Sequence, residues 1–308
     1  MVGALALALV VGLAGSLAIA TDTLGAGQRW ESVQARLERF LAGPVPDRPT
    51  VATVRVTEPP ASASPTISPT NAPTASAEPG TTPVPTIAPV PTPSPTPEPV
   101  RAPVEFAITD DPEAFFASQV HKDWCTPAAL QIVLALHGLV DTGRRTQEEI
   151  AGRVREWESL SDSRNGNWGP GAMALALDAY GAPGYEVRAF ETRQGALRDS
   201  ARAIQATGAP VILLTWRGAH TWVMSGFRAD ADPTVFRDAH IDGTYILDPW
   251  YPRISSLWGP SDPAGTFQDT AEMERNFLPW KRPEGRYPDR DGLYITVAPT
   301  IPISPPAG

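Results

Sequence analysis

The sequence predicts an α+β domain in which a layer of helices packs on a mostly antiparallel sheet. Segments with the apolar spacing of helices come first along the chain, and segments with strand character follow them with short connections. We expect this domain over residues 104–300. Its length of about two hundred residues is enough to bury one hydrophobic core.

Four stretches are expected to be helical: 127–138, 146–158, 169–181 and 192–208. The first, third and fourth end at a glycine, which is typical of a helix C-terminus. The second begins with Thr146 and Glu149, which have the spacing of a capping box. Five stretches rich in β-branched and aromatic residues are expected to be strands: 185–190, 210–216, 220–227, 243–250 and 292–299.

Residues 1–20 form an uncharged run of small and aliphatic residues that ends in Ala18-Ile19-Ala20. This ending has the A-x-A form of a signal-peptidase site, although no basic residue precedes Arg29. At about 1.5 Å per residue, the run is also just long enough to cross a bilayer core of about 30 Å. We therefore expect a signal peptide or a single membrane anchor, and an extracytoplasmic domain.

Two further segments precede the domain. Residues 21–57 are expected to be juxtamembrane and to contain a short amphipathic helix that lies on the membrane or pairs with another copy; its apolar face would comprise Trp30, Val33, Leu37, Phe40 and Leu41. Residues 58–103 are rich in Pro, Ser and Thr and cannot bury enough apolar surface to fold. They predict a disordered, extended stalk that holds the domain away from a surface. Residues 301–308 are expected to be a tail.

Composition excludes several classes of function. The net charge is −9 and no basic run is interleaved with aromatic residues, so nucleic acid is not an expected partner. The chain contains no glycine-rich nucleotide-binding motif and no Cys/His spacing typical of zinc sites. We therefore expect neither a cofactor nor a metal.

Cys125 is the only cysteine of the chain. An unpaired cysteine in an exported protein is a buried inert thiol, an intermolecular disulfide or a reactive nucleophile. Cys125 directly precedes Thr126-Pro127, and proline favours the first turn of a helix. A thiol at a helix N-terminus is stabilised as the thiolate, so its position favours the nucleophile.

A nucleophilic cysteine needs a base and a group that orients the base. Of the four histidines, at positions 121, 137, 220 and 240, His220 alone begins an apolar strand. Asp248 ends a later strand and is the candidate for orienting the imidazole. The alternative for Asp248 is a simple turn, because Asp-Pro dipeptides commonly begin turns.

In this order, the residues resemble the papain-like clan of cysteine peptidases, and within it the branch of bacteriocin-processing, double-glycine leader peptidases. The resemblance is carried by Gln119 six positions before Cys125, by the strand from His220 to Gly226-Phe227, and by Asp248. It covers about residues 116–250 and implies a papain-like fold. It also implies that the Gln119 amide and the backbone N–H of Cys125 stabilise the oxyanion. Thr126 stands where that branch often has glycine.

These observations predict a thiol-dependent hydrolase of peptide or amide bonds that works through a Cys-His-Asp triad and an acyl-enzyme. Its substrate would be a peptide or a protein, with Trp124 and Trp250 as candidate residues of the binding cleft. Two alternatives remain open. A transglutaminase-like acyl transferase would use the same residues, and a catalytically silent binding module on a stalk would keep Cys125 buried.

Overall fold

The computed structural model describes residues 33, 37, 40, 41, 43–57, 99–163 and 168–302. The expected signal peptide or anchor at 1–20 lies outside the described residues. So do Trp30, the part of the expected stalk between residues 58 and 98, and residues 303–308.

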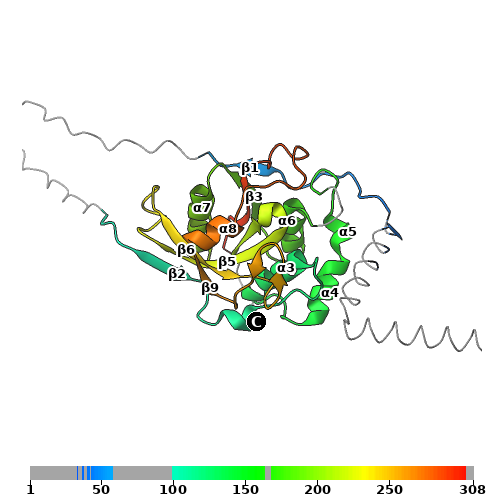
Figure 1. Ribbon diagram of the computed structural model, residues 1–308, viewed down its shortest axis with the longest axis horizontal. Helices are drawn as coiled ribbons and strands as arrows, with labels where there is room; N and C mark the ends of the chain where they lie inside the picture. Colours follow the sequence, from blue (N-terminus) through cyan, green and yellow to red (C-terminus); the bar gives the residue numbers. More distant parts are fainter. Residues whose placement is uncertain are drawn as a thin grey trace, which may run out of the picture.

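The described strands form an eight-stranded sheet, as predicted mostly antiparallel (Figure 1). Its order is β1 (Thr53–Arg55), β3 (Tyr185–Phe190), β10 (Tyr294–Pro299), β4 (Val211–Thr215), β5 (His220–Ala229), β6 (Ile241–Leu247) and β9 (Thr266–Asp269), and β2 (Val104–Ala107) also pairs with β5. Every described pair in this sheet except β1 with β3 is antiparallel. Two short strands, β7 (Ile254–Ser255) and β8 (Gly259–Pro260), pair separately. All five predicted strands are present.

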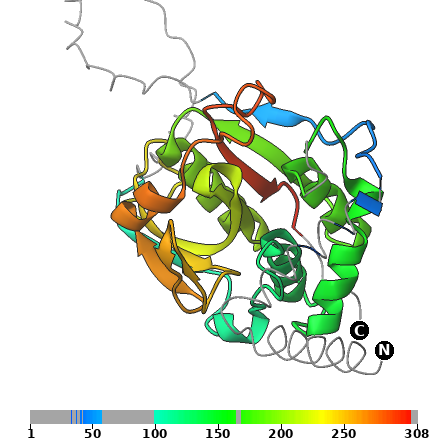
Figure 2. The ribbon, with the colours of Figure 1, turned by 45° about the vertical axis from the view of Figure 1, so that its right-hand side comes forward.

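Helices cover both faces of the sheet (Figures 1 and 2). One face packs against α3 (Cys125–Leu136), α4 (Arg144–Gly152), α5 (Val154–Trp157) and α6 (Pro170–Ala179). The other face packs against α7 (Arg193–Thr207) and α8 (Thr270–Asn276). Along β4 the side chains alternate between the two cores, with Ile212 and Leu214 in the first and Val211 and Leu213 in the second. The predicted packing of helices on the sheet is confirmed, and the predicted helix 192–208 lies on the opposite face from the other three. Two short 3₁₀ helices, η2 (Pro112–Phe115) and η3 (Trp216–Gly218), complete the described elements.

The predicted helix 146–158 differs in detail. It begins earlier, at Arg144, and divides into α4 and α5 at Arg153. Thr146 is inside the helix, where its hydroxyl donates to Asp141 Oδ1 at 2.6 Å, so the predicted capping box with Glu149 is wrong.

The N-terminal segment 43–57 belongs to the folded domain. Strand β1 pairs with β3, in the register of Thr53 with Val187. The Arg48 guanidinium donates to the carbonyl oxygens of Glu156 at 2.7 Å and Arg155 at 2.8 Å. After the Pro-rich stretch, Arg101 pairs with Asp230 and Asp238. The expected boundary at residue 104 therefore leaves out a strand, and the stretch 58–98 connects two strands of one sheet.

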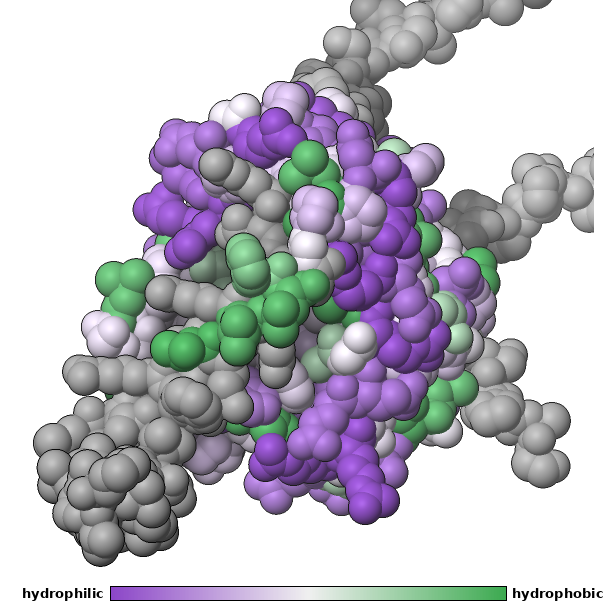
Figure 3. Space-filling model, turned by 90° about the vertical axis from the view of Figure 1, so that its right-hand side faces the viewer, coloured by the Kyte–Doolittle hydropathy of each residue, from purple (hydrophilic) through white to green (hydrophobic). Residues whose placement is uncertain are grey.

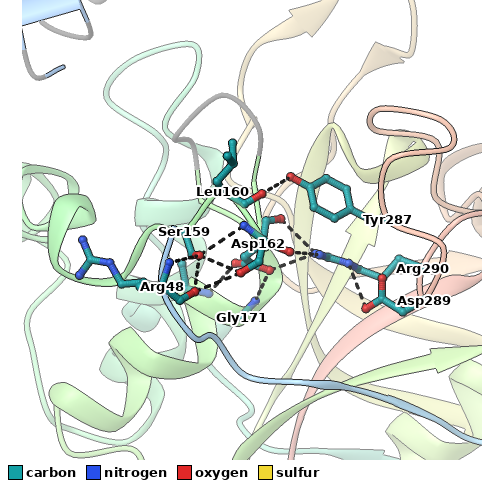
Figure 4. Close-up of polar contacts among 10 residues, drawn as sticks. Arg48, Ser159, Leu160, Asp162, Gly171, Tyr287, Asp289 and Arg290 are labelled. Atoms are coloured by element: carbon teal, nitrogen blue, oxygen red, sulfur yellow. Dashed lines mark hydrogen bonds and ion pairs between the residues drawn. The ribbon is translucent and has the colours of Figure 1, made fainter. Parts of the chain in front are cut away.

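A buried ion pair anchors the turn that contacts this segment (Figure 4). Arg290 Nη1 lies 3.0 Å from Asp162 Oδ1, and both side chains are almost fully buried. The same carboxylate accepts the backbone N–H groups of Gly171 and Ala172 in the first turn of α6. Ser159, three residues before Asp162, donates to the Arg48 carbonyl. Removing one member of a buried pair typically costs about 3–5 kcal/mol, so these contacts stabilise the junction of three chain segments.

Four described residues of the expected amphipathic helix, Val33, Leu37, Phe40 and Leu41, are helical and 53–81% exposed. Hydrophobic side chains gather on the face of the molecule seen from the side of α4 and α5 (Figure 3). Within the residues that the structure describes, no helix is both long and apolar enough to cross a membrane.

Candidate active site

Cys125 is the first residue of α3 and has a free thiol. No side chain of the described residues caps this helix, whose N-cap is Trp124. The N–H groups of the first turn and the helix dipole therefore act on the Cys125 side chain, and both favour the thiolate. The buried apolar residues of α3 fix the helix against the sheet.

His220 begins β5 and lies opposite Thr215 of β4. Its side chain is 2% exposed, and Nε2 lies 2.6 Å from Asp248 Oδ1. The other side of the ring forms a hydrogen bond with Cys125. Since Nε2 faces Asp248, Nδ1 is the ring nitrogen that faces the thiol. The structure thus brings together Cys125, His220 and Asp248, the three residues selected from the sequence.

Asp248 follows β6 directly. Strands β5 and β6 are neighbours, with Val223 opposite Leu247, so the end of β6 lies beside the start of β5. The 28 positions that separate His220 from Asp248 include the loop 230–240, which lies at the opposite end of this hairpin. Asp248 Oδ1 also accepts the backbone N–H of Trp250 at 2.9 Å. The sequence left two roles open for Asp248, a contact with His220 and a turn. In the structure the same carboxylate oxygen has both contacts.

The pKa values of Cys125 and His220 shift in opposite directions. Burial raises the pKa of the Cys125 thiol, but the hydrogen bond and charge of His220, together with hydrogen bonds from Thr221 and Thr126, outweigh it, so that the net pKa is lowered. Burial lowers the pKa of His220, whereas the charge and hydrogen bond of Asp248, together with Cys125, raise it to about 9. These shifts favour a thiolate–imidazolium pair at neutral pH.

The other histidines have different surroundings. His121 packs edge-on against Trp124, with ring centroids 4.2 Å apart. His137 Nε2 lies 3.2 Å from the hydroxyl of Tyr185. His240 is half-exposed beside Asp242, at the far end of the β5–β6 hairpin. None of the three is among the residues that line the cleft described below.

Two tryptophans contact the His220 ring, and a third packs on one of them. Trp216 stacks on the imidazole, with centroids 4.1 Å apart and planes 22° apart. Trp250 meets the same ring edge-on, at 6.2 Å and 83°. Trp258 stacks on Trp216 in turn, at 5.7 Å and 6°. Sequence reasoning did not select Trp216 or Trp258. The only signal for Trp216 was its position four residues before His220.

Gln119 is buried, and its Nε2 donates to the His121 carbonyl at 2.8 Å. Its Oε1 has no hydrogen-bond partner among the described residues. An amide nitrogen carries two hydrogens, so one remains for a second acceptor. Gln119 is not, however, one of the described residues that line the cleft.

Side chains from two elements hold the backbone of residues 118–120. Gln147 of α4 accepts from Val120 N at 2.6 Å and donates to the Ser118 carbonyl at 3.1 Å. Arg253 Nη2 donates to the carbonyl oxygens of Gln119 and Val120, at 3.0 and 2.9 Å. Because Arg253 follows the Asp248 turn, it links that turn to the segment that carries Gln119. Neither Gln147 nor Arg253 was selected from the sequence.

A cleft of about 970 Å³ adjoins Cys125 and His220. Trp124 and Trp250, the two expected cleft residues, both line it. The buried side chains of Met173, Leu214 and Trp280 also line it, so part of its wall is apolar. Among the described residues, no group of three or more His, Cys, Asp or Glu side chains is arranged to hold a metal ion.

No protein-family model matches the sequence, and no curated protein matches it either. A similar chain occurs in the crystal structure of a double glycine motif protease from an AMS/PCAT transporter in complex with the leader peptide. The two chains are 17% identical, and the match, with a TM-score of 0.30, covers 60% of this chain and 91% of that chain. That protein is of the branch that the sequence motifs resemble.

Proposed function

We propose that this protein is a thiol-dependent hydrolase of peptide or amide bonds. The observation that supports this best is the continuous chain of contacts from Cys125 through His220 to Asp248, beside a cleft. A merely structural cysteine does not require a charged, carboxylate-bonded imidazole at its side. The opposite pKa shifts of the thiol and the ring support the same function.

In the proposed mechanism, the Cys125 thiolate attacks the carbonyl carbon of the scissile bond, and a tetrahedral oxyanion forms. The backbone N–H of Cys125 and the second amide hydrogen of Gln119 would donate to this oxygen. The His220 imidazolium then gives its proton to the leaving amine, and a thioester to Cys125 remains. Neutral His220 next takes a proton from water, whose oxygen attacks the thioester. The thiolate leaves, the acid is released and the thiolate–imidazolium pair is restored.

A peptide or protein is the proposed substrate. The cleft is larger than a single side chain, and its wall combines Trp124 and Trp250 with an apolar region around Met173. Such a cleft suits an extended chain whose apolar side chains leave water.

We also propose an extracytoplasmic location, on the basis of the apolar run and the Ala18-Ile19-Ala20 site. The test is to express the full chain in a secreting host and to sequence the N-terminus of the protein found outside the cytoplasm. An N-terminus at Thr21 would support a cleaved signal peptide, and retention in the membrane fraction would support an anchor. Accumulation of intact chain in the cytosol would contradict both.

The catalytic proposal is tested by labelling the full chain with an electrophilic peptidyl epoxide, followed by mapping of the labelled peptide. We expect a label on Cys125 that grows with the thiolate fraction, and none in Cys125→Ala, which should remain folded. Hydrolysis of a peptide library should disappear in the same variant. A variant that keeps more than about a tenth of the wild-type rate would exclude Cys125 as the nucleophile.

The same assay separates the alternatives. With an added primary amine, a transferase would form the amide product in preference to the acid. A silent binding module would alkylate at pH 6 no faster than an ordinary thiol, whose pKa is about 8.5.

A further inference from the structure

Trp216 occupies an unusual turn between β4 and β5. Its φ is 52°, and that of the next residue, Arg217, is 62°, which are left-handed values that non-glycine residues rarely adopt. Trp216 Nε1 donates to Asn276 Oδ1 at 2.9 Å, in a buried position. The Trp216 carbonyl accepts from Ala219 N, which closes the turn. Local strain of this kind persists only where surrounding contacts impose it, and it gathers at functional sites.

The turn places the indole on the face of His220. The ring centroids are 4.1 Å apart, and the indole also stacks with Trp258, which helps to fix its position. Asp248 and Cys125 bind the imidazole in its plane. The stack therefore restrains the rotation about χ2 that would carry the ring nitrogens away from both partners.

The titratable groups that face the imidazole are Cys125 from α3 and Asp248 after β6. The charged residues that line the cleft are Lys122, Asp123, Glu148, Arg155, Asp162 and Arg282. Four of them are exposed, and the buried Asp162 carboxylate is paired with Arg290. Two aromatic rings also contact the imidazole: Trp216 presents its face, and Trp250 meets the imidazole edge-to-face. A ring face carries negative electrostatic potential and attracts an imidazolium more than a neutral imidazole.

We propose that Trp216 is a positioning residue, which holds the His220 ring in the plane of Asp248 and Cys125 and thereby favours the thiolate–imidazolium pair. The inference rests on the proposed function, since it assumes that this pair is the reactive state. Trp216 would act through His220 and without contact to the reacting bond.

The test compares Trp216→Leu, which removes the aromatic face, with Trp216→Phe, which keeps a face but loses the N–H. Trp157 provides matched controls, Trp157→Leu and Trp157→Phe, because it is also a buried, aromatic-packed tryptophan and does not line the cleft. The readout is the second-order rate of Cys125 alkylation by iodoacetamide at pH 6, where only an ion-paired thiol reacts rapidly. The kcat and KM values for a peptide substrate are measured in parallel.

We expect Trp216→Leu to lower the alkylation rate by about 10-fold, since stacking and the attraction of a cation to a ring together account for about one order of magnitude. The kcat should fall by a similar factor with KM unchanged, and Trp216→Phe should restore most of both rates. The Trp157 variants should lose thermal stability without a change in alkylation rate.

A folded Trp216→Leu protein that alkylates at the wild-type rate would overturn the inference. If that variant does not fold, Asn276→Ala gives the same test. This substitution removes the hydrogen bond that holds the Trp216 indole, and Asn276 is not among the described residues that line the cleft. There we expect a decrease of about 3-fold, and an unchanged rate would equally overturn the inference. If the wild-type thiol itself reacts slowly at pH 6, the proposed function fails first, and the two failures are thereby distinguished.

Discussion

Replacing Asp248 by asparagine removes one negative charge beside His220 but keeps an oxygen that can accept both of its hydrogen bonds. In the structure, Oδ1 accepts from His220 Nε2 at 2.6 Å and from Trp250 N at 2.9 Å. The side chain is 6% exposed, so bulk water screens the charge only weakly. A hydrogen bond to a charged group contributes about 1.5–3 kcal/mol, against about 0.5–1.5 kcal/mol for a neutral one. The difference of about 1–2 kcal/mol predicts that kcat/KM falls by about 5- to 30-fold at pH 7.

The same charge sets the pH dependence. Burial lowers the pKa of His220, but Asp248 and Cys125 raise it to about 9. The imidazolium that protonates the leaving amine is thus present below this pH and is lost above it. The wild-type profile of kcat/KM should fall in an alkaline limb near pH 9, and in Asp248→Asn this limb should move to lower pH.

Asp248→Ala serves as the comparison. It leaves the N–H of Trp250 and the ring of His220 without an acceptor, so the rate should fall further than in Asp248→Asn. An unsatisfied buried group costs about 1–3 kcal/mol, and the melting temperature should fall as well. The assay is kcat/KM on a fluorogenic peptide per folded molecule, together with thermal unfolding. If both variants lose stability but keep the wild-type specific rate, Asp248 is only a turn residue.

Two further predictions concern substitutions, and a third concerns limited proteolysis. His220→Ala should lower kcat/KM by several orders of magnitude, whereas His121→Ala should act mildly; the opposite result in a steady-state assay would assign the base to the loop before Cys125. Gln119→Ala should lower kcat by about 100-fold with little effect on KM, because its amide would act in the transition state; an effect on KM alone would make it a binding residue. Limited proteolysis should cut between residues 58 and 98 without loss of activity, and the two fragments should remain together on native size exclusion. Loss of the N-terminal fragment with full activity retained would show that β1 contributes nothing to the fold.

The fold class could be predicted because the apolar residues of most segments recur with a clear helix or strand period, and because capping residues mark where helices begin and end. The strand 220–227 and the helix after Cys125 are long and apolar, and α7 has both a Thr192 cap and a C-terminal Gly208. Strand β1 could not be predicted in this way, since three residues carry no readable alternation. It exists because β3 offers a free edge and Arg48 fixes the preceding chain.

The catalytic candidates could be predicted because the proposed chemistry requires particular residue types: a thiol, an imidazole and a carboxylate. One thiol, one histidine at a strand start and one carboxylate at a strand end sufficed to select Cys125, His220 and Asp248. The residues that support them gave no such signal. Trp216 reaches His220 only because its turn adopts left-handed backbone angles, and Arg253 reaches residues 119–120 only through tertiary packing. Aromatic and amide side chains are common in cores, so their roles depend on contacts that sequence spacing does not encode.

The position of residues 58–98 between two strands of one sheet has a thermodynamic consequence. The Pro-, Ser- and Thr-rich composition of residues 58–98 predicts a disordered connection. For such a connection, each doubling of length raises the entropic cost of closure by only about 0.6 kcal/mol. The fold can therefore tolerate large changes in the length of this stretch. The distance between residue 20 and the folded domain is then set by the length of chain before residue 43, where the continuous described segment of the domain begins. The intact connection also gives β1 a high effective concentration at the edge of β3. Once the connection is cut, the fragment that carries β1 should dissociate from the rest of the domain as the protein is diluted.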